Sequence, residues 1–280
     1  MNLTTAFKDA PTRTVDVDGT SFAYRELGPP TGVPAVFLHH LGAVLDNWDP
    51  RVVDGIAARR HVITFDNRGV GASSGRTPNT IEAMARDAMA FIGALGFEKV
   101  DLFGFSMGGM LAQVMVQQEP QLVRKLVLAG TGPARGEGIV RVTATTLLDM
   151  AHGAVTFKDP KTYLFFTGTA NGRASAKSYL ARLRERTDDR DKSVSISSFR
   201  AQLKAIHRWG KQGPDDLSRI DHPVLMMNGD HDRMVPTVNT IDMARRFPNA
   251  ELTVYPDAGH GGVFQYHEDF VNRALDFLER

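Results

Sequence analysis

The sequence predicts an α/β protein whose sheet is mostly parallel and is covered by helices on both faces. Short, continuous apolar runs such as residues 34–39 and 61–65 lack polar alternation, as expected of strands buried on both sides. Between them lie longer segments whose apolar residues recur at helical spacing. Strands that alternate with helices favour parallel crossover units, and 280 residues suit one such domain with an insertion.

Composition excludes several classes of function. A net charge of +1 gives no electrostatic basis for binding nucleic acid or an anionic membrane. The absence of cysteine removes disulfides and thiolate chemistry and fits a reducing compartment. The amino terminus, residues 1–9, has no signal-peptide pattern, and no apolar run is long enough to span a bilayer. We therefore expect a cytoplasmic protein that acts on a small-molecule substrate, with no nucleic-acid or membrane partner; the oligomeric state is not readable.

The first two expected strands, residues 12–17 and 22–27, alternate apolar and polar positions and flank Asp18-Gly19. Because Asp-Gly favours a tight turn with positive φ, we expect an antiparallel hairpin there. The other expected strands are residues 34–39, 61–65, 100–105, 122–128, 223–228 and 251–255. Expected helices outside the insertion are residues 47–57, 80–95, 106–118, a segment ending near 246, and 267–278.

The rhythm of the sequence changes between residues 132 and 214, where no buried strand is expected. Helical patterns cover residues 140–150, 175–186 and 194–209. We interpret this region as a helical cap inserted over the carboxyl edge of a core formed by residues 1–131 and 215–280. Its large apolar residues either pack among themselves or line a pocket. The charged run at residues 182–191 mixes both signs and is expected to be a solvated helix end.

A catalytic motif is centred on Ser106. An apolar strand ends abruptly in Gly104-Phe105-Ser106-Met107-Gly108, and a helical pattern follows. This is the G-x-S-x-G pattern in its informative context, between a strand and a helix. The glycines let strand and helix pass close to the serine. The structural alternative is a glycine-rich turn whose serine only caps the helix.

Two later residues complete the constellation that an acyl-transfer serine needs. Asp232 and His260 each follow an expected strand, as Ser106 does, and open α/β sheets place their sites at the carboxyl ends of strands. Their order in the chain, Ser, Asp, His, is the order typical of this topology. A base and an orienting carboxylate are what the serine requires to attack an acyl group. Asp230 is a competing candidate for the carboxylate.

The chain resembles proteins of the α/β-hydrolase fold, in the group that carries a helical cap after the sixth of eight strands. The resemblance rests on His39 and the loop after it, Asp66-x-Arg68-Gly69-x-Gly71-x-Ser73, Gly104-x-Ser106-x-Gly108-Gly109, Gly229-x-x-Asp232-x-x-Val235-Pro236 and Gly259-His260. It implies a Ser106–His260–Asp232 triad, with Asp232 favoured over Asp230 by the motif spacing. It also implies an oxyanion hole formed by the backbone N–H groups of Leu41 and Met107.

One residue departs from the family pattern. Where the family usually has His-Gly, this chain has His39-His40, so a titratable side chain either reaches toward the pocket or packs within the loop. We also expect the Asp66–Arg68 stretch to brace loops under the site. Candidate substrate-binding residues are His40, Leu147, Phe166 and Trp209.

The predicted function is a serine hydrolase that cleaves a carboxylic ester or lactone through an acyl-enzyme, without metal or other cofactor. A serine at the elbow argues against the dehalogenases and epoxide hydrolases of the family, which use a carboxylate nucleophile. Three alternatives remain: a cofactor-free haloperoxidase or perhydrolase, a carbon–carbon bond hydrolase, and a non-catalytic ligand receptor. The apolar residues of the insertion favour a medium-sized, uncharged substrate group.

Overall fold

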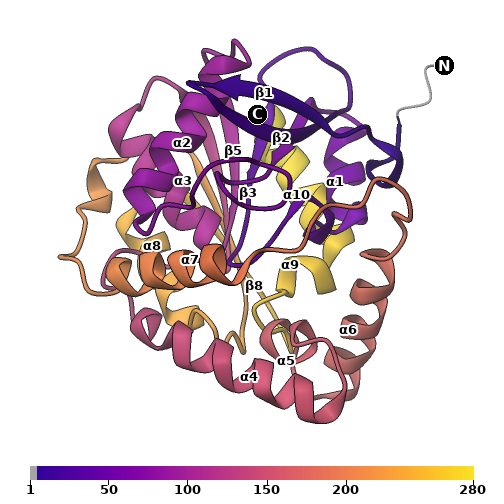
Figure 1. Ribbon diagram of the computed structural model, residues 1–280. Coiled ribbons are helices and arrows are strands. Elements are labelled where there is room, and N and C mark those ends of the chain that lie inside the picture. The colour runs from indigo at the N-terminus through magenta and orange to yellow at the C-terminus, as the bar shows by residue number, and fades with distance from the viewer. Residues whose placement is uncertain (1–4) are drawn as a thin grey trace.

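The computed structural model describes residues 5–280 and has an eight-stranded sheet at its centre (Figure 1). The strand order is β1-β2-β4-β3-β5-β6-β7-β8, and β2 is antiparallel to both of its neighbours while the remaining pairs are parallel. The strands are β1 Arg13–Val17, β2 Thr20–Leu27, β3 Ala35–Leu38, β4 Val62–Phe65, β5 Val100–Phe105, β6 Val123–Ala129, β7 Val224–Gly229 and β8 Ala250–Tyr255. The predicted fold class, a mostly parallel α/β sheet, is confirmed.

The hairpin expected from Asp18-Gly19 is present. β1 and β2 pair antiparallel, and Val17 lies opposite Thr20 across the turn. Asp18 has φ 50° and Gly19 has φ 76°, the two positive values that this tight turn needs.

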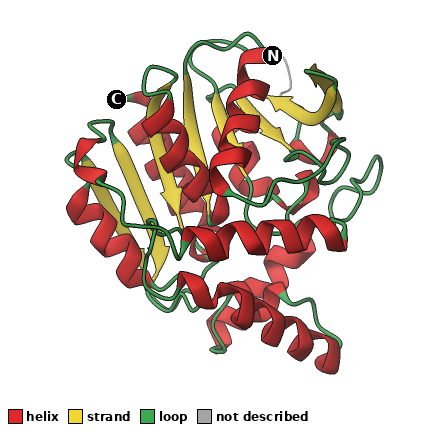
Figure 2. Ribbon diagram, turned by 60° about the vertical axis from the view of Figure 1, so that its left-hand side comes forward, coloured by secondary structure: helices red, strands yellow, loops and turns green. Residues whose placement is uncertain are grey.

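Helices cover both faces of the sheet, as Figure 2 shows. Alternate side chains of one strand point to opposite faces, so Val36 and Leu38 join one core cluster while Ala35 and Phe37 join the other. The helices on the first side are α2 Ile81–Ala94, α3 Met107–Gln118 and α8 Thr237–Arg246. Those on the second side are α1 Pro50–Ala57, α9 Gly262–Gln265 and α10 His267–Glu279. Two apolar cores therefore hold the strand ends at fixed positions.

The segment between β6 and β7 forms α4 Val142–Thr156, α5 Lys161–Phe165, α6 Ala170–Arg182 and α7 Ile196–Trp209. In Figure 1 these pink-to-orange helices gather at one end of the sheet. The patterns at residues 140–150 and 194–209 correspond to α4 and α7. The helix expected at 175–186 is displaced toward the amino terminus, because the Thr169 hydroxyl caps α6 by accepting the Gly172 N–H at 3.0 Å.

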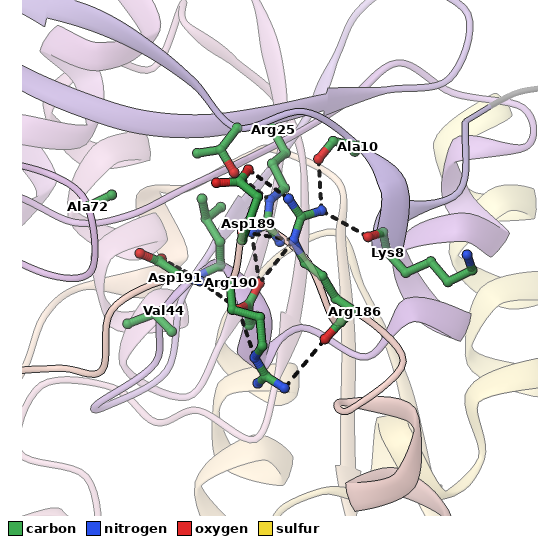
Figure 3. Close-up of polar contacts among 12 residues, drawn as sticks. Lys8, Ala10, Arg25, Val44, Ala72, Arg186, Asp189, Arg190 and Asp191 are labelled. Carbon is green, nitrogen blue, oxygen red and sulfur yellow. Dashed lines mark hydrogen bonds and ion pairs between the residues drawn. The ribbon is translucent and has the colours of Figure 1, made fainter.

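The expectation of a solvated helix end at residues 182–191 holds only in part: α6 ends at Arg182 and residues 187–190 are exposed, but two arginines meet the core. Arg182 binds both carboxylate oxygens of the buried Asp49. The guanidinium of Arg186 is buried and donates to the Ala10 carbonyl at 2.8 Å, as Figure 3 shows. Asp46 lies among the arginines of this region and accepts the Asp191 N–H at 2.8 Å. The run mixes both signs of charge in the sequence, but in the folded chain Arg182 and Arg186 lie beside Asp49 and Asp46 of the core.

No helix among residues 5–280 combines the length and the apolar character needed to cross a bilayer. Residues 1–4, which belong to the amino-terminal stretch without a signal-peptide pattern, lie outside the described residues.

Candidate active site

Ser106 lies at the sharp turn between β5 and α3, in a backbone conformation that serine rarely adopts. Its φ is 56° and its ψ is −116°, and its N–H donates to the Ala129 carbonyl at 2.9 Å, which fixes the turn to β6. Within the described chain its hydroxyl makes no capping hydrogen bond to α3. The capping alternative therefore has no support, and the hydroxyl is free for another role.

The glycines around Ser106 are required by close backbone approaches. A Cβ at Gly108 would lie 1.9 Å from the Leu38 carbonyl oxygen on β3. A Cβ at Gly104 would lie 2.6 Å from the Gly109 Cα. The motif is thus explained by packing of strand against helix, which leaves the serine at the strand end, largely buried.

Asp232 and His260 form a buried hydrogen-bonded pair. The distance from His260 Nδ1 to Asp232 Oδ2 is 2.7 Å, and both side chains are almost fully buried. Asp232 Oδ1 accepts the backbone N–H groups of Met234 and Val235 at 2.8 and 3.0 Å, which fixes the carboxylate. Because a carboxylate can only accept, Nδ1 donates, and Nε2 of a neutral ring is left as the basic atom.

The other aspartates near His260 have different partners. Asp230 accepts the Ala258 N–H at 3.1 Å and contacts the exposed His231 ring. Asp257, at φ 47°, binds side chains that cap and begin α6, namely those of Thr167, Thr169 and Asn171. The structure therefore brings His260 to Asp232 and leaves Asp230 in the role of a loop brace.

A cavity of about 1070 Å³ lies over this end of the sheet. Ser106 and His260 both line it, and so do His40, Leu41 and Leu147. The sequence left open whether Met150 and Phe199 line a pocket, and it did not point to the other apolar wall residues of the insertion. Together these wall residues include Val140, Met150, Leu164, Val194, Ile196, Phe199 and Leu203. The helical periodicity of α7 was the signal that could have found them, since Ile196, Phe199 and Leu203 share one face.

Two of the predicted substrate-binding residues do not line the cavity. Phe166 is buried against Tyr179, with 5.6 Å between the ring centroids. Trp209 is buried and its Nε1–H donates to the Gly132 carbonyl at 3.2 Å. Both side chains hold the insertion on the core, because burying a large aromatic surface stabilises that contact.

The backbone N–H groups of Leu41 and Met107 have no acceptor among residues 5–280. Met107 is the first residue of α3, where an N–H has no partner within the helix and the dipole is positive. The loop that carries Leu41 is anchored at the next residue, since the Gly42 N–H donates to Gln202 Oε1 at 2.7 Å. Both groups are therefore free donors at this end of the sheet.

His40 packs within the loop and also forms part of the cavity wall. Its ring stands edge-on to Phe105 and Phe165, with centroids 5.3 and 5.1 Å away. Burial, with a smaller effect from His39, holds the pKa of His40 well below its usual range, so the ring is neutral. Its Nδ1–H donates to the Leu41 carbonyl at 3.0 Å. The residue thus restrains the peptide that follows it.

Asp66 and Arg68 brace loops as the sequence predicts. Asp66 accepts the N–H groups of Leu45 and Ala72 at 2.9 and 3.1 Å. Arg68 pairs with Asp87 on α2 at 3.0 Å. Among residues 5–280 there is no group of three or more acidic or imidazole side chains placed to hold a metal ion.

Comparisons with known proteins agree with this fold. A family model described as the α/β-hydrolase fold matches residues 34–265. The chain belongs to the α/β-hydrolase fold family. The resemblance inferred from the sequence motifs is therefore confirmed.

Three relatives span nearly the whole chain. An α/β-hydrolase fold protein from Chitinophaga pinensis is 38% identical and has a TM-score of 0.92, covering 98% of this chain and 99% of that one. Est816, described as an N-acyl homoserine lactone degrading enzyme, is 25% identical with a TM-score of 0.76, covering 95% and 100%. A non-heme haloperoxidase of Rhodococcus erythropolis is 28% identical over 276 residues, covering 94% of this chain and 97% of the relative.

Proposed function

We propose that this α/β hydrolase cleaves a carboxylic ester or lactone through a covalent acyl-enzyme on Ser106. The observation that carries the proposal is the 2.7 Å hydrogen bond between Asp232 and His260. His260 lines the same cavity as Ser106, whose backbone is strained and whose hydroxyl does not cap α3. Similarity to a lactone-degrading enzyme supports the substrate class. The partner is a small molecule, since a cavity of about 1070 Å³ beside Ser106 suits one.

The proposed mechanism assigns one role to each group. Ser106 Oγ attacks the carbonyl carbon while His260 Nε2 takes its proton, and Asp232 stabilises the imidazolium that forms. The N–H groups of Leu41 and Met107 donate to the oxyanion, aided by the positive end of α3. His260 then gives the proton to the departing alcohol, or to the ring oxygen of a lactone. Water, deprotonated by His260, releases the acid and regenerates Ser106.

The first test is a substrate panel for the wild-type protein and Ser106→Ala. We expect turnover of nitrophenyl esters of increasing acyl length, or of lactones, and a loss of at least ~10³-fold in kcat for the variant with an unchanged circular dichroism spectrum. A fluorophosphonate probe should label Ser106 and add its mass to that peptide. Turnover that survives in Ser106→Ala would remove the mechanism, and an unlabelled Ser106 would favour a non-catalytic receptor.

A second candidate uses the same residues for perhydrolysis, in which hydrogen peroxide replaces water at the acyl-enzyme. The similarity to a non-heme haloperoxidase favours it. Bromination of a phenol in acetate with peroxide, dependent on Ser106, is the outcome that would support this activity. Ester hydrolysis without bromination would exclude it. A carbon–carbon bond hydrolase has no observation of its own here and is tested by adding diketones to the panel.

A further inference from the structure

The cavity wall is mostly apolar and includes a group of cations. Lys161 on α5 and Arg200 and Lys204 on α7 all line it, against a single lining carboxylate, Asp159. Lys161 Nζ lies 3.6 Å from Asp159 Oδ1, and the exposed fraction of the lysine side chain is 25%. Arg200 and Lys204 have no carboxylate within ion-pair distance among residues 5–280. The cavity therefore carries an uncompensated positive charge.

The cations of α7 belong to the face that lines the cavity. The cavity-lining residues of this helix recur at helical spacing, and they are Ile196, Phe199, Arg200, Leu203, Lys204 and His207. The opposite face is buried against the core through residues such as Ile206 and Trp209. Arg200 and Lys204 are one turn apart on the lining face, so their aliphatic stems extend the apolar wall while the charged heads remain exposed toward the mouth.

We propose that the substrate carries an anionic group, such as a carboxylate, which Arg200 and Lys204 bind with Lys161 while the apolar body fills the cavity toward Ser106. This inference rests on the proposed function and departs from the expectation of an uncharged substrate group. A fully apolar substrate would supply no counter-charge to the cations that Asp159 does not balance. An anionic end group supplies that counter-charge, and charge-assisted hydrogen bonds are stronger than those between neutral groups.

The test compares substrates that differ only in charge. Nitrophenyl half-esters of linear dicarboxylic acids with six to ten carbons are set against the same esters ending in a primary amide, which has the same shape. A parallel arm places the carboxylate or the amide on the alcohol. We expect the ratio of kcat/KM, anion over amide, to exceed about ten in at least one arm and to fall with added salt.

Substitutions of the two cations on α7 then test which residues bind the anionic group. Arg200→Gln/Lys204→Gln should lower that ratio by about tenfold, whereas the matched control Lys177→Gln/Lys211→Gln, which removes two exposed cations outside the cavity, should leave it unchanged. An anion-to-amide ratio near one in both arms, or an equal fall of the ratio in both double variants, would overturn the proposal. Hydrolysis of the amide-ended esters that depends on Ser106 would meanwhile leave the proposed function intact.

Binding without turnover separates the two proposals further. Ser106→Ala, which cannot form the acyl-enzyme, is titrated with suberate and with suberamide by calorimetry. We expect suberate to bind more tightly, and we expect the difference to disappear when Arg200→Gln/Lys204→Gln is combined with Ser106→Ala. Equal binding of both compounds would contradict the anion site whatever the esterase assays give.

Discussion

At the scale of single residues, the site depends on how closely the chain passes itself at the elbow. Ser106 keeps φ at 56° because the hydrogen bond from its N–H to Ala129 and the packing of α3 on β3 leave no other path. Gly108 is where this packing is tightest. The serine is thus presented by backbone strain that neighbouring elements stabilise.

Gly108→Ala tests this dependence. The added methyl group would meet the Leu38 carbonyl at 1.9 Å, so we expect a loss of more than about 3 kcal/mol in the free energy of unfolding, or an insoluble product. The control is Gly93→Ala, an exposed position near the end of α2 where a Cβ meets nothing within 4 Å, and it should gain up to about 1 kcal/mol. Urea denaturation measures both. A Gly108→Ala protein with wild-type stability would show that the elbow tolerates a side chain.

At the scale of elements, the segment between α6 and α7 is joined to the core by a buried carboxyl pair. A Cβ at Gly71 would lie 2.3 Å from Asp66 Oδ2 and 2.5 Å from Asp191 Oδ2, so both oxygens meet at this glycine. The Leu45 N–H donates to both side chains, at 2.9 and 3.3 Å. Burial, followed by the hydrogen bond and charge of Asp191, raises the pKa of Asp66 well above its usual range. Asp66 therefore holds a proton, which it shares with Asp191 through the hydrogen bond between the two side chains. Figure 3 shows Asp191 near the arginines of this region.

Asp191→Asn tests the shared proton. The folded protein keeps a proton that the unfolded chain releases above pH 3.8. The free energy of unfolding therefore falls as pH rises from 3.8 toward the raised pKa of Asp66, by about 1.4 kcal/mol per pH unit. An asparagine N–H replaces that proton without titrating. We expect the free energy of unfolding of the variant, relative to wild type, to improve by about 1–3 kcal/mol between pH 5 and pH 8. Asp188→Asn, at an exposed neighbouring position, should show the wild-type dependence of stability on pH. If Asp191→Asn and wild type showed the same dependence, the shared proton would be contradicted.

At the scale of the whole molecule, two neutral histidines are built into the core below the site. Burial, with a smaller effect from Arg25, lowers the pKa of His39 to about 3, and its ring lies 5.2 Å from Trp48. Burial lowers the pKa of His40 in the same way. In the unfolded chain both rings would take up a proton below about pH 6.5. Folding therefore excludes protons that the unfolded chain binds in mild acid.

The stability this provides is complete above pH 6.5 and is lost as pH falls toward 3, because only the unfolded state gains the protons. We expect the free energy of unfolding to fall by about 1.4 kcal/mol per pH unit for each histidine below pH 6. His39→Gln should lower stability at pH 7. It should also make the fall in the free energy of unfolding with acid less steep, by the amount that corresponds to about one bound proton. His152→Gln, at an exposed position on α4, should keep the full slope. Denaturant melts from pH 4.5 to 7.5 measure these slopes, and equal slopes in wild type and His39→Gln would refute the account.

Local patterns were enough to predict the strands, the hairpin at Asp18-Gly19 and the elbow at Ser106, because each depends on the period of apolar residues or on glycine within a few positions. The motif spacing that favoured Asp232 agrees with the hydrogen bond to His260. Local patterns failed in the insertion. Phe166 and Trp209 are as apolar as the residues that line the cavity, and sequence alone does not say which face each meets.

The sequence by itself determined the layered fold, the order of its elements and the three side chains proposed for catalysis, since these follow from periodicity and from short-range backbone constraints. Only the tertiary structure decided that Arg182 meets Asp49 and Arg186 meets Asp46, and that Arg200 and Lys204 line the cavity. The physical reason is that a charged side chain is stable either in water or beside an opposite charge. Which of the two it meets depends on segments more than a hundred residues away in the chain.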